Sequence, residues 1–270
     1  MTSVTAMTPG TIACGVGGIM ALLGLVVGPA LVYLEEKRHF RQLSVIRTIA
    51  VVQVWIALAF IEAVRLFTMK NLLGYNVRMQ AHGACGRISG LLFKTFFDKY
   101  VIEGAEKLPQ GNEPFIIVAN HQSMMDVAAI FALRLKAAWV AKTAVFVIPG
   151  VGWLMWLAEY IPVKRKNKES IKQMYADCKV AVKDGWSLII FPQGTRNRQT
   201  TLPFKDGAFN LAAELGVPIL PVSIVISDDL WLNGSRVKIV VHDLVKDTSD
   251  KEKTKNACFK TIMAATEYAK

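Results

Sequence analysis

The chain has few cysteines and few histidines, and its acidic side chains are outnumbered by basic ones. Its 270 residues include four cysteines, four histidines, 21 Asp and Glu residues and 32 Lys and Arg residues. The cysteines lie far apart, with no C-x-x-C pair and no matching histidine spacing, which argues against a zinc site or a disulfide framework. We expect no metal, and we interpret all four cysteines as buried or idle thiols: Cys14, Cys85, Cys178 and Cys258.

The sequence also lacks a recognisable nucleic-acid-binding signature, because no basic run is interleaved with aromatic residues. The net charge of +11 at pH 7 then favours a phospholipid surface or a polyanionic substrate, with a merely solvated basic surface as the alternative. A chain of this length accommodates one sizeable α/β domain and an appendage. Hydrophobic residues make up 53%, which is high for a soluble enzyme but interrupted by charge too often for a polytopic transporter. A membrane-attached globular domain fits both facts.

Two apolar stretches near the N-terminus predict the attachment. Residues 11–34 are 24 residues without a charge, enough to cross a hydrocarbon core of about 30 Å. A signal peptide is the alternative, but no positive charge precedes the stretch, which exceeds the usual ~7–15-residue apolar region. Residues 48–61 are only 14 residues long, which is more typical of an interfacial or re-entrant helix. We expect a membrane-attached helical hairpin over residues 1–70 and a second domain over residues 71–270.

The charges after the first stretch predict an orientation. Lys37, Arg38 and Arg41 follow it directly, and the positive-inside tendency places that end in the cytoplasm. The second domain would then face the cytoplasm, unless residues 48–61 also cross the membrane and put it on the opposite side.

From about residue 85, short apolar strands alternate with helical stretches. Such alternation predicts an α/β sandwich, with helices around a largely buried sheet. The expected strands are 115–118, 139–141, 161–163, 187–191, 219–225 and 237–241, and the expected helices begin at 127 or cover 151–160, 171–182 and 207–215. Gly216 would close the last of these helices, and residues 249–255 would begin a terminal one.

The stretch NHQSMMD places a histidine and an aspartate where a strand passes into a helix. His121 follows an apolar strand, and Asp126 lies on the opening turn of the next helix, within reach of the imidazole. The carboxylate would fix the histidine tautomer and stabilise the imidazolium. With no G-x-S-x-G elbow, Ser123 is more simply a cap or turn hydroxyl than a nucleophile. His242 and Asp247 show the same spacing, so only the surroundings can separate a catalytic pair from a coincidence.

A second apolar strand, about 70 residues later, runs into FPQGTR. There Gly194 permits close backbone approach or a positive φ, and Arg196 offers a planar fork suited to phosphate, with Lys205 as a possible second cation. Lys142 and Arg165 follow two further strands. Each cation alone could be a solvated surface charge, but their shared position after apolar strands favours an anion-binding edge.

NHQSMMD, IPVKR, FPQGTR and VPILPV occur in the order and rough spacing of the four motifs of the glycerophospholipid acyltransferases. The chain resembles this family, including its 1-acyl-sn-glycerol-3-phosphate acyltransferases, over about residues 115–225, and the segments LPFKDGAF and IPGVGW add to the likeness. None of these motifs accompanies His242 and Asp247, so we expect their five-residue spacing to be a coincidence. The resemblance implies transfer of an acyl group from acyl-CoA or acyl-carrier protein, as co-substrate and without a cofactor, to the sn-2 hydroxyl of lysophosphatidate, giving phosphatidic acid.

The resemblance also implies residue roles. His121 would be the general base and Asp126 would orient it, without a covalent enzyme intermediate. The substrate-binding residues implied are Lys142, Arg165, Gln193, Gly194, Thr195, Arg196 and Pro221. Among these, Arg196 with Gly194 and Thr195 would hold the substrate phosphate, and Pro221 would shape the wall near the acyl donor.

The chain departs from the family pattern at two positions: Gln193 stands where the third motif usually has glutamate, and Lys164 stands where an acidic residue is common. The identity of the acyl acceptor therefore has alternatives, namely another lysophospholipid or glycerol 3-phosphate. From another class, the chain could be a catalytically silent membrane-binding protein that retains the fold.

Overall fold

The computed structural model describes residues 43–96, 99–196, 202–226 and 236–267. The first apolar stretch, residues 11–34, lies outside these residues, as does Cys14. The described chain divides into two compact units. One contains the chain up to residue 92 together with residues 144–159, and the other contains residues 93–143 and 160–270.

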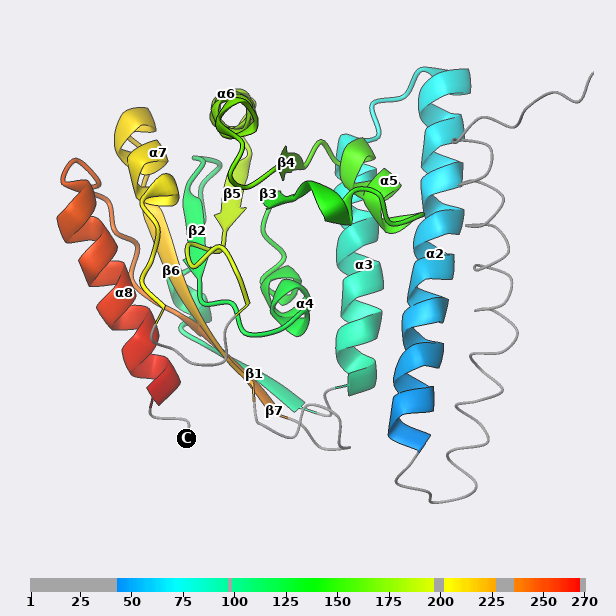
Figure 1. Cartoon of the computed structure of the whole chain (residues 1–270), viewed down its shortest axis with the longest axis horizontal. Helices are drawn as coiled ribbons and strands as arrows, with labels where there is room; N and C mark the ends of the chain where they lie inside the picture. Colours follow the sequence, from blue (N-terminus) through cyan, green and yellow to red (C-terminus); the bar gives the residue numbers. More distant parts are fainter. Residues whose placement is uncertain (1–42, 97–98, 197–201, 227–235, 268–270) are drawn as a thin grey trace, which may run out of the picture. The chain divides into compact units, whose positions relative to one another are not determined.

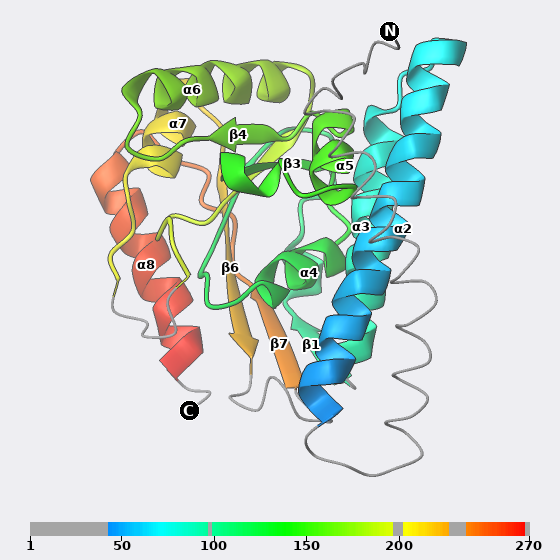
Figure 2. The ribbon, with the colours of Figure 1, turned by 45° about the vertical axis from the view of Figure 1, so that its right-hand side comes forward.

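Two long helices dominate the first unit, α2 (Leu43–Leu73) and α3 (Arg78–Phe96), which run side by side (Figures 1 and 2). The short helix α5 (Val151–Leu157) packs against α2. At this contact Gly150 has φ 76° and its backbone lies so close to α2 that an added Cβ would stand 2.4 Å from the amide nitrogen of Phe60. Glycine is therefore required there for both its conformation and its size.

Helix α2 is longer than the sequence suggested. The 14-residue stretch 48–61 was expected to be a short helix because Glu62 follows it, whereas the helix has 31 residues and continues to Leu73. Glu62 is accommodated because its carboxylate accepts two hydrogen bonds of 2.8 Å from Arg65 and one of 3.0 Å from Arg87 on α3. Within the described residues, one helical segment, Ala50–Leu73, is long and apolar enough to cross a membrane.

The second unit is built around a seven-stranded mixed sheet with the strand order β1-β7-β6-β2-β5-β3-β4. Among the described strands, β6 and β7 pair antiparallel, and the other neighbouring pairs are parallel. The strands are β1 (Lys99–Glu103), β2 (Ile116–Ala119), β3 (Ala137–Lys142), β4 (Ile161–Val163), β5 (Ser187–Ile190), β6 (Ile219–Ile226) and β7 (Arg236–Val241). The β-branched, fully buried run of β2 is typical of a central parallel strand.

Helices flank this sheet, with α7 and α8 on one face and α4 on the other (Figure 1). The helices are α4 (Met125–Ala132), α6 (Lys168–Lys183), α7 (Gly207–Leu215) and α8 (Lys251–Glu267), and two short 3-10 turns are η1 (Ala105–Lys107) and η2 (Thr143–Val145). The expected α/β sandwich is confirmed. Gly216 closes α7 in the left-handed region, as predicted.

Candidate active site

The loop between β2 and α4 carries the predicted catalytic pair. Nδ1 of His121 lies 2.8 Å from Oδ2 of Asp126, whose side chain is completely buried. The same oxygen accepts hydrogen bonds from the backbone N–H groups of Gln122 at 2.6 Å and Ser123 at 2.8 Å. A hydrogen bond from a neutral imidazole to an ionised carboxylate puts the proton on Nδ1 and leaves the lone pair on Nε2. The loop thus fixes the orientation of the His121 ring through its Nδ1.

Ser123 acts as a turn hydroxyl, as expected. Its Oγ accepts a hydrogen bond of 2.9 Å from the backbone N–H of Met125, at the start of α4. This contact helps the chain to turn from β2 into the helix and brings Asp126 back toward the imidazole. The other carboxylate oxygen of Asp126, Oδ1, is buried and has no hydrogen-bond partner among the described residues.

The imidazole is also held from the neighbouring strand. The ring of His121 stacks on Phe191, the residue after β5, with centroids 4.0 Å apart and planes 6° from parallel. Phe191 in turn packs against Trp139 of β3, at 5.7 Å between centroids. Because β2 and β5 are adjacent parallel strands, the residues that follow them meet at one edge of the sheet.

Asn120 is a positioning residue that the sequence reasoning did not single out. Its side-chain amide donates to the carbonyl of Ile224 and accepts from the N–H of Ile224, both at 2.7 Å. The pair of bonds ties the end of β2 to β6 one residue before His121. The signal available in the sequence was a polar residue placed directly after a fully apolar strand.

Gln193 is buried, and it links the two motif loops. Its Oε1 accepts a hydrogen bond of 2.9 Å from the backbone N–H of His121, and only 3% of the residue is exposed. This contact needs an acceptor but no charge, so glutamine can make it as well as glutamate.

The next residue, Gly194, fulfils both reasons given for a glycine. It has φ 71°, and an added Cβ would stand 2.8 Å from Nζ of Lys205. Lys205 reaches this position because its backbone N–H bonds to the carbonyl of Pro192 at 2.9 Å, which closes the loop after β5.

The remaining predicted cations lie on the same sheet edge. Lys142 ends β3, Arg165 follows β4 and Arg196 follows β5, and all three are exposed, as is Thr195. The structure therefore brings His121, Asp126 and Gln193 into direct contact. It places the three cations at successive strand ends, with no described bond between them and the imidazole.

Pro221 lies inside the sheet, not on a loop. It is a buried residue of β6, opposite Val118 of β2 in the parallel register. Its carbonyl accepts a hydrogen bond of 3.1 Å from the N–H of His242. That Pro221 shapes the wall near the acyl donor stays a prediction.

The second histidine and aspartate, which share the catalytic spacing, make separate contacts. Nε2 of His242 lies 2.7 Å from Oγ of Ser223, while Asp247 accepts bonds from both the backbone N–H and the hydroxyl of Ser249. Burial, reinforced by the nearby Lys107 ammonium, lowers the pKa of His242. The spacing shared with the catalytic pair is a coincidence of sequence, as the surrounding motifs had suggested.

Comparison with known proteins identifies the class first. Residues 99–225 match the family model described as Acyltransferase, and this region contains the His–Asp pair, the loop after β5 and the first part of β6.

The matched relatives within that class are 1-acyl-sn-glycerol-3-phosphate acyltransferases. The matched chloroplastic enzyme of Brassica napus, 1-acyl-sn-glycerol-3-phosphate acyltransferase BAT2, is 36% identical over 154 residues, which cover 54% of this chain and 45% of the relative. The human 1-acyl-sn-glycerol-3-phosphate acyltransferase alpha is 31% identical over 138 residues, covering 50% of this chain and 48% of the relative. The chain is similar to these 1-acyl-sn-glycerol-3-phosphate acyltransferases, and it spans about half the length of the curated relatives it matches.

A solved structure supports the fold. The 1-acyl-sn-glycerophosphate acyltransferase PlsC of Thermotoga maritima superposes with a TM-score of 0.57 at 23% identity, covering 95% of this chain and 94% of that one. At this identity the likeness establishes the arrangement of the elements alone.

Proposed function

We propose that this protein transfers a fatty acyl group from an acyl thioester to the sn-2 hydroxyl of 1-acyl-sn-glycerol 3-phosphate, giving phosphatidic acid. The observation that carries the proposal is the 2.8 Å contact of His121 with the buried Asp126, at a sheet edge where Arg196 follows the adjacent strand. The names of the matched relatives state this activity.

In the proposed reaction, Nε2 of His121 takes the proton of the sn-2 hydroxyl as its oxygen attacks the thioester carbonyl carbon. Asp126 stabilises the imidazolium that forms. The tetrahedral intermediate collapses with cleavage of the carbon–sulfur bond, and the imidazolium returns the proton to the departing thiolate. The products are phosphatidic acid and the free thiol of the carrier, with no covalent enzyme intermediate.

The acceptor phosphate is proposed to bind at the loop after β5. In lysophosphatidate the phosphate is separated from the sn-2 hydroxyl by only two glycerol carbons and an ester oxygen, so its site has to lie close to His121. Arg196 can meet a phosphate with two parallel hydrogen bonds, and Gly194 and Thr195 offer backbone and hydroxyl donors beside it. Lys142, on the next strand, would add charge to this subsite.

Gln193 is proposed to act on substrate binding through the loop. By accepting the N–H of His121 it fixes the spacing between the base and the phosphate loop. Because this contact does not depend on charge, we expect the glutamine to preserve catalysis.

We propose that the protein acts at a phospholipid membrane. Both substrates carry acyl chains, and the helical segment Ala50–Leu73 is long and apolar enough to cross a membrane. We propose that the second unit faces the cytoplasm, on the basis of the cations Lys37, Arg38 and Arg41.

The direct test is acyl transfer by the purified full chain in mixed micelles, with a labelled acyl thioester and lysophosphatidate, glycerol 3-phosphate or lysophosphatidylcholine as acceptor. Labelled phosphatidic acid as the main product supports the proposal. Preferred acylation of either other acceptor would reassign the acceptor, and transfer to none of the three would leave the silent membrane-binding alternative.

A further inference from the structure

A dense group of positive charge lies at the end of β4. Residues 164–168 (KRKNK), here named the basic turn, carry four cations in five positions, all exposed: Lys164, Arg165, Lys166 and Lys168. None of the four forms an ion pair within the part of the chain that the structure describes. Elsewhere in the same unit, several cations are paired with carboxylates: Lys107 with Asp243, Lys179 with Glu214, Lys238 with Glu103 and Lys255 with Asp206.

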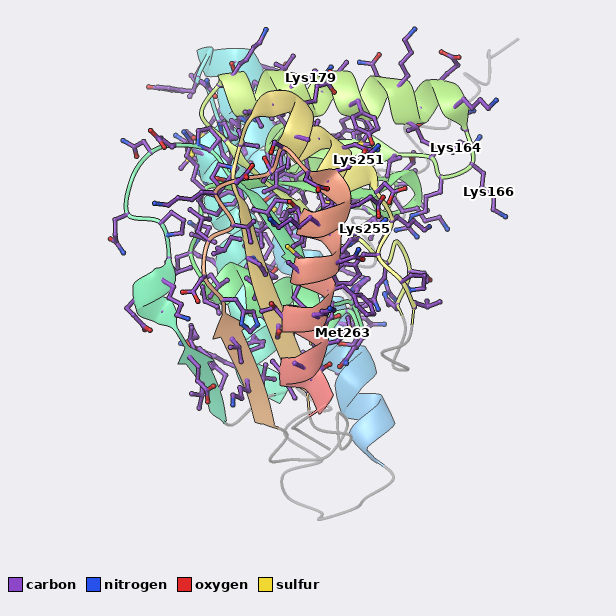
Figure 3. The ribbon with its side chains drawn as sticks, turned by 90° about the vertical axis from the view of Figure 1, so that its left-hand side faces the viewer. Lys164, Lys166, Lys179, Lys251, Lys255 and Met263 are labelled. Atoms are coloured by element: carbon purple, nitrogen blue, oxygen red, sulfur yellow. The ribbon has the colours of Figure 1, made fainter. Side chains whose placement is uncertain are left out.

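The basic turn has a fixed backbone. The N–H of Lys164 donates to Oγ of Ser170 at 2.8 Å, and Asn167 caps α6 by accepting from the N–H of Ser170 at 2.8 Å. The turn closes with a bond of 3.2 Å from the N–H of Asn167 to the carbonyl of Lys164. Figure 3 shows Lys164 and Lys166 at one end of α6, with Lys179 further along the helix. An ordered turn presents its charges in a reproducible arrangement, which an anionic ligand can use.

The sheet places the basic turn on the catalytic edge but away from the base. Lys142 of β3 is paired in register with Val163, so the turn begins one residue beyond the level of Lys142. Between β2, which carries His121, and β4 lie two strands, β5 and β3. At a spacing of about 4.8 Å between neighbouring strands, the end of β4 is about 14 Å from the end of β2.

This distance separates the two kinds of phosphate in the proposed reaction. The acceptor phosphate has to bind near His121, and the loop after the adjacent strand β5 supplies Arg196 for it. In a thioester donor, the whole pantetheine arm separates the reacting carbonyl from the nearest phosphate, so the donor phosphate lies well away from the base. The basic turn lies at a distance from His121 that suits the donor phosphate.

We propose that the basic turn binds the phosphate end of the phosphopantetheine arm of the acyl donor. The inference rests on the proposed function and deepens it, because it assigns the cations of this chain to two subsites: Arg196 to the acceptor, and residues 164–168 to the donor. The recognised chemistry, a phosphate on pantetheine, is shared by acyl-CoA and acyl-carrier protein. Exposed cations attract such groups mainly through long-range charge, which salt screens.

The test uses the full chain with the triple variant Lys164→Gln, Lys166→Gln and Lys168→Gln, and three donors: acyl-CoA, acyl-carrier protein and acyl-pantetheine, which has no phosphate. We expect the variant to raise KM about tenfold for one or both phosphate-bearing donors, since each exposed charge contact contributes little alone. KM for acyl-pantetheine and for lysophosphatidate should not change. The donor whose KM rises identifies the source of the phosphate.

Two matched variants control for net charge and for folding. The first is a triple variant that removes three positive charges near the start of α8: Lys246→Gln, Lys251→Gln and Lys253→Gln (Lys251 is labelled in Figure 3). It should leave every KM unchanged. Replacing the three lysines of the basic turn with arginine should restore the wild-type KM. Higher salt should raise the donor KM of the wild type and have less effect on the glutamine variant.

Binding of CoA and of pantetheine, measured by calorimetry, tests the turn even if no transfer is detected. We expect the glutamine variant to weaken CoA binding about tenfold and to leave pantetheine binding unchanged. The inference is overturned if the variant changes KM for lysophosphatidate instead, if acyl-pantetheine is affected equally, or if neither phosphate-bearing donor is affected. Failure of the wild type to acylate any acceptor would instead refute the proposed function.

Discussion

At the scale of single residues, hydrogen-bond context separates two histidines with the same sequence spacing. His121 stacks on Phe191 and contacts a buried carboxylate, whereas His242 contacts a buried hydroxyl and its pKa is lowered. A general base needs a partner that stabilises its protonated form, and of these two histidines His121 is the one whose described contact is a carboxylate.

We therefore expect His121→Ala to reduce kcat by ~10²–10⁴-fold, the usual contribution of a general base. His242→Ala should have little effect on kcat, because its imidazole is not at the site. The measurement is steady-state acyl transfer to lysophosphatidate by both variants. Equal activity of the two variants would show that the base is wrongly assigned.

Arg196 is the residue expected to bind the acceptor phosphate. Arg196→Ala should cost about 2–5 kcal/mol in acceptor binding, the scale for removing one partner of a desolvated charge pair, and Arg196→Lys should bind more weakly than the wild type but measurably. The loss should appear in KM for lysophosphatidate if the contact is equally strong in the ground and transition states. A two-substrate kinetic series checks this, and a change confined to the donor KM would place the acceptor phosphate elsewhere.

At the scale of elements, the contact of Ser223 in β6 with His242, directly after β7, joins the antiparallel pair of the sheet. The hydroxyl also donates to the carbonyl of Ile262 in α8 at 3.1 Å, so the three elements meet at one buried oxygen.

This contact predicts a pH dependence of stability. Because the pKa of His242 is lower in the folded protein than in the unfolded chain, the unfolded state binds the proton first as the pH falls. The contribution of His242 is complete above its unfolded pKa of about 6.5 and is lost as the pH falls through the lower, folded value. Urea unfolding at pH 7.5 and 5.5 should show a larger loss of stability for the wild type than for His242→Gln. An equal loss in both proteins would contradict the assignment.

At the scale of the whole molecule, the chain leaves the sheet-containing unit after residue 143 and returns at residue 160. The intervening segment has no charged residue before Glu159, and it exposes Val147 and Trp156, at 75% and 52%. Its backbone is packed against α2 at Gly150, and the Trp153 ring lies 5.2 Å from that of Phe60.

Deleting residues 1–68 should therefore release the protein from membranes only partly. Removal of most of α2 uncovers the surface on which Gly150 and Trp153 pack, and this adds apolar area to the already exposed Trp156. The basic surface would still be attracted to anionic lipids. Sedimentation with anionic and neutral vesicles measures the residual binding, and a wholly soluble truncated protein would refute this prediction.

The sequence by itself determined the parts of this protein that depend on local pattern. The sequence predicted the short buried strands, the helix periodicity and Gly216 at a helix end, because each depends on the backbone of a few neighbouring residues. The contact of His121 with Asp126 could be predicted for the same reason, since a strand-to-helix loop brings residues five apart together. The need for a glycine at position 194 also follows from the local turn.

Only the tertiary structure decided what depends on distant partners. Helix α2 continues through Glu62 because Arg87, on another helix, helps to neutralise it, and β1 has no counterpart among the expected strands because its register depends on β7. Gln193 became a partner of His121, and Asn120 a tie to β6, through contacts spanning 72 and 104 residues. Such contacts arise only when the order of strands is fixed, and no spacing along the chain encodes that order.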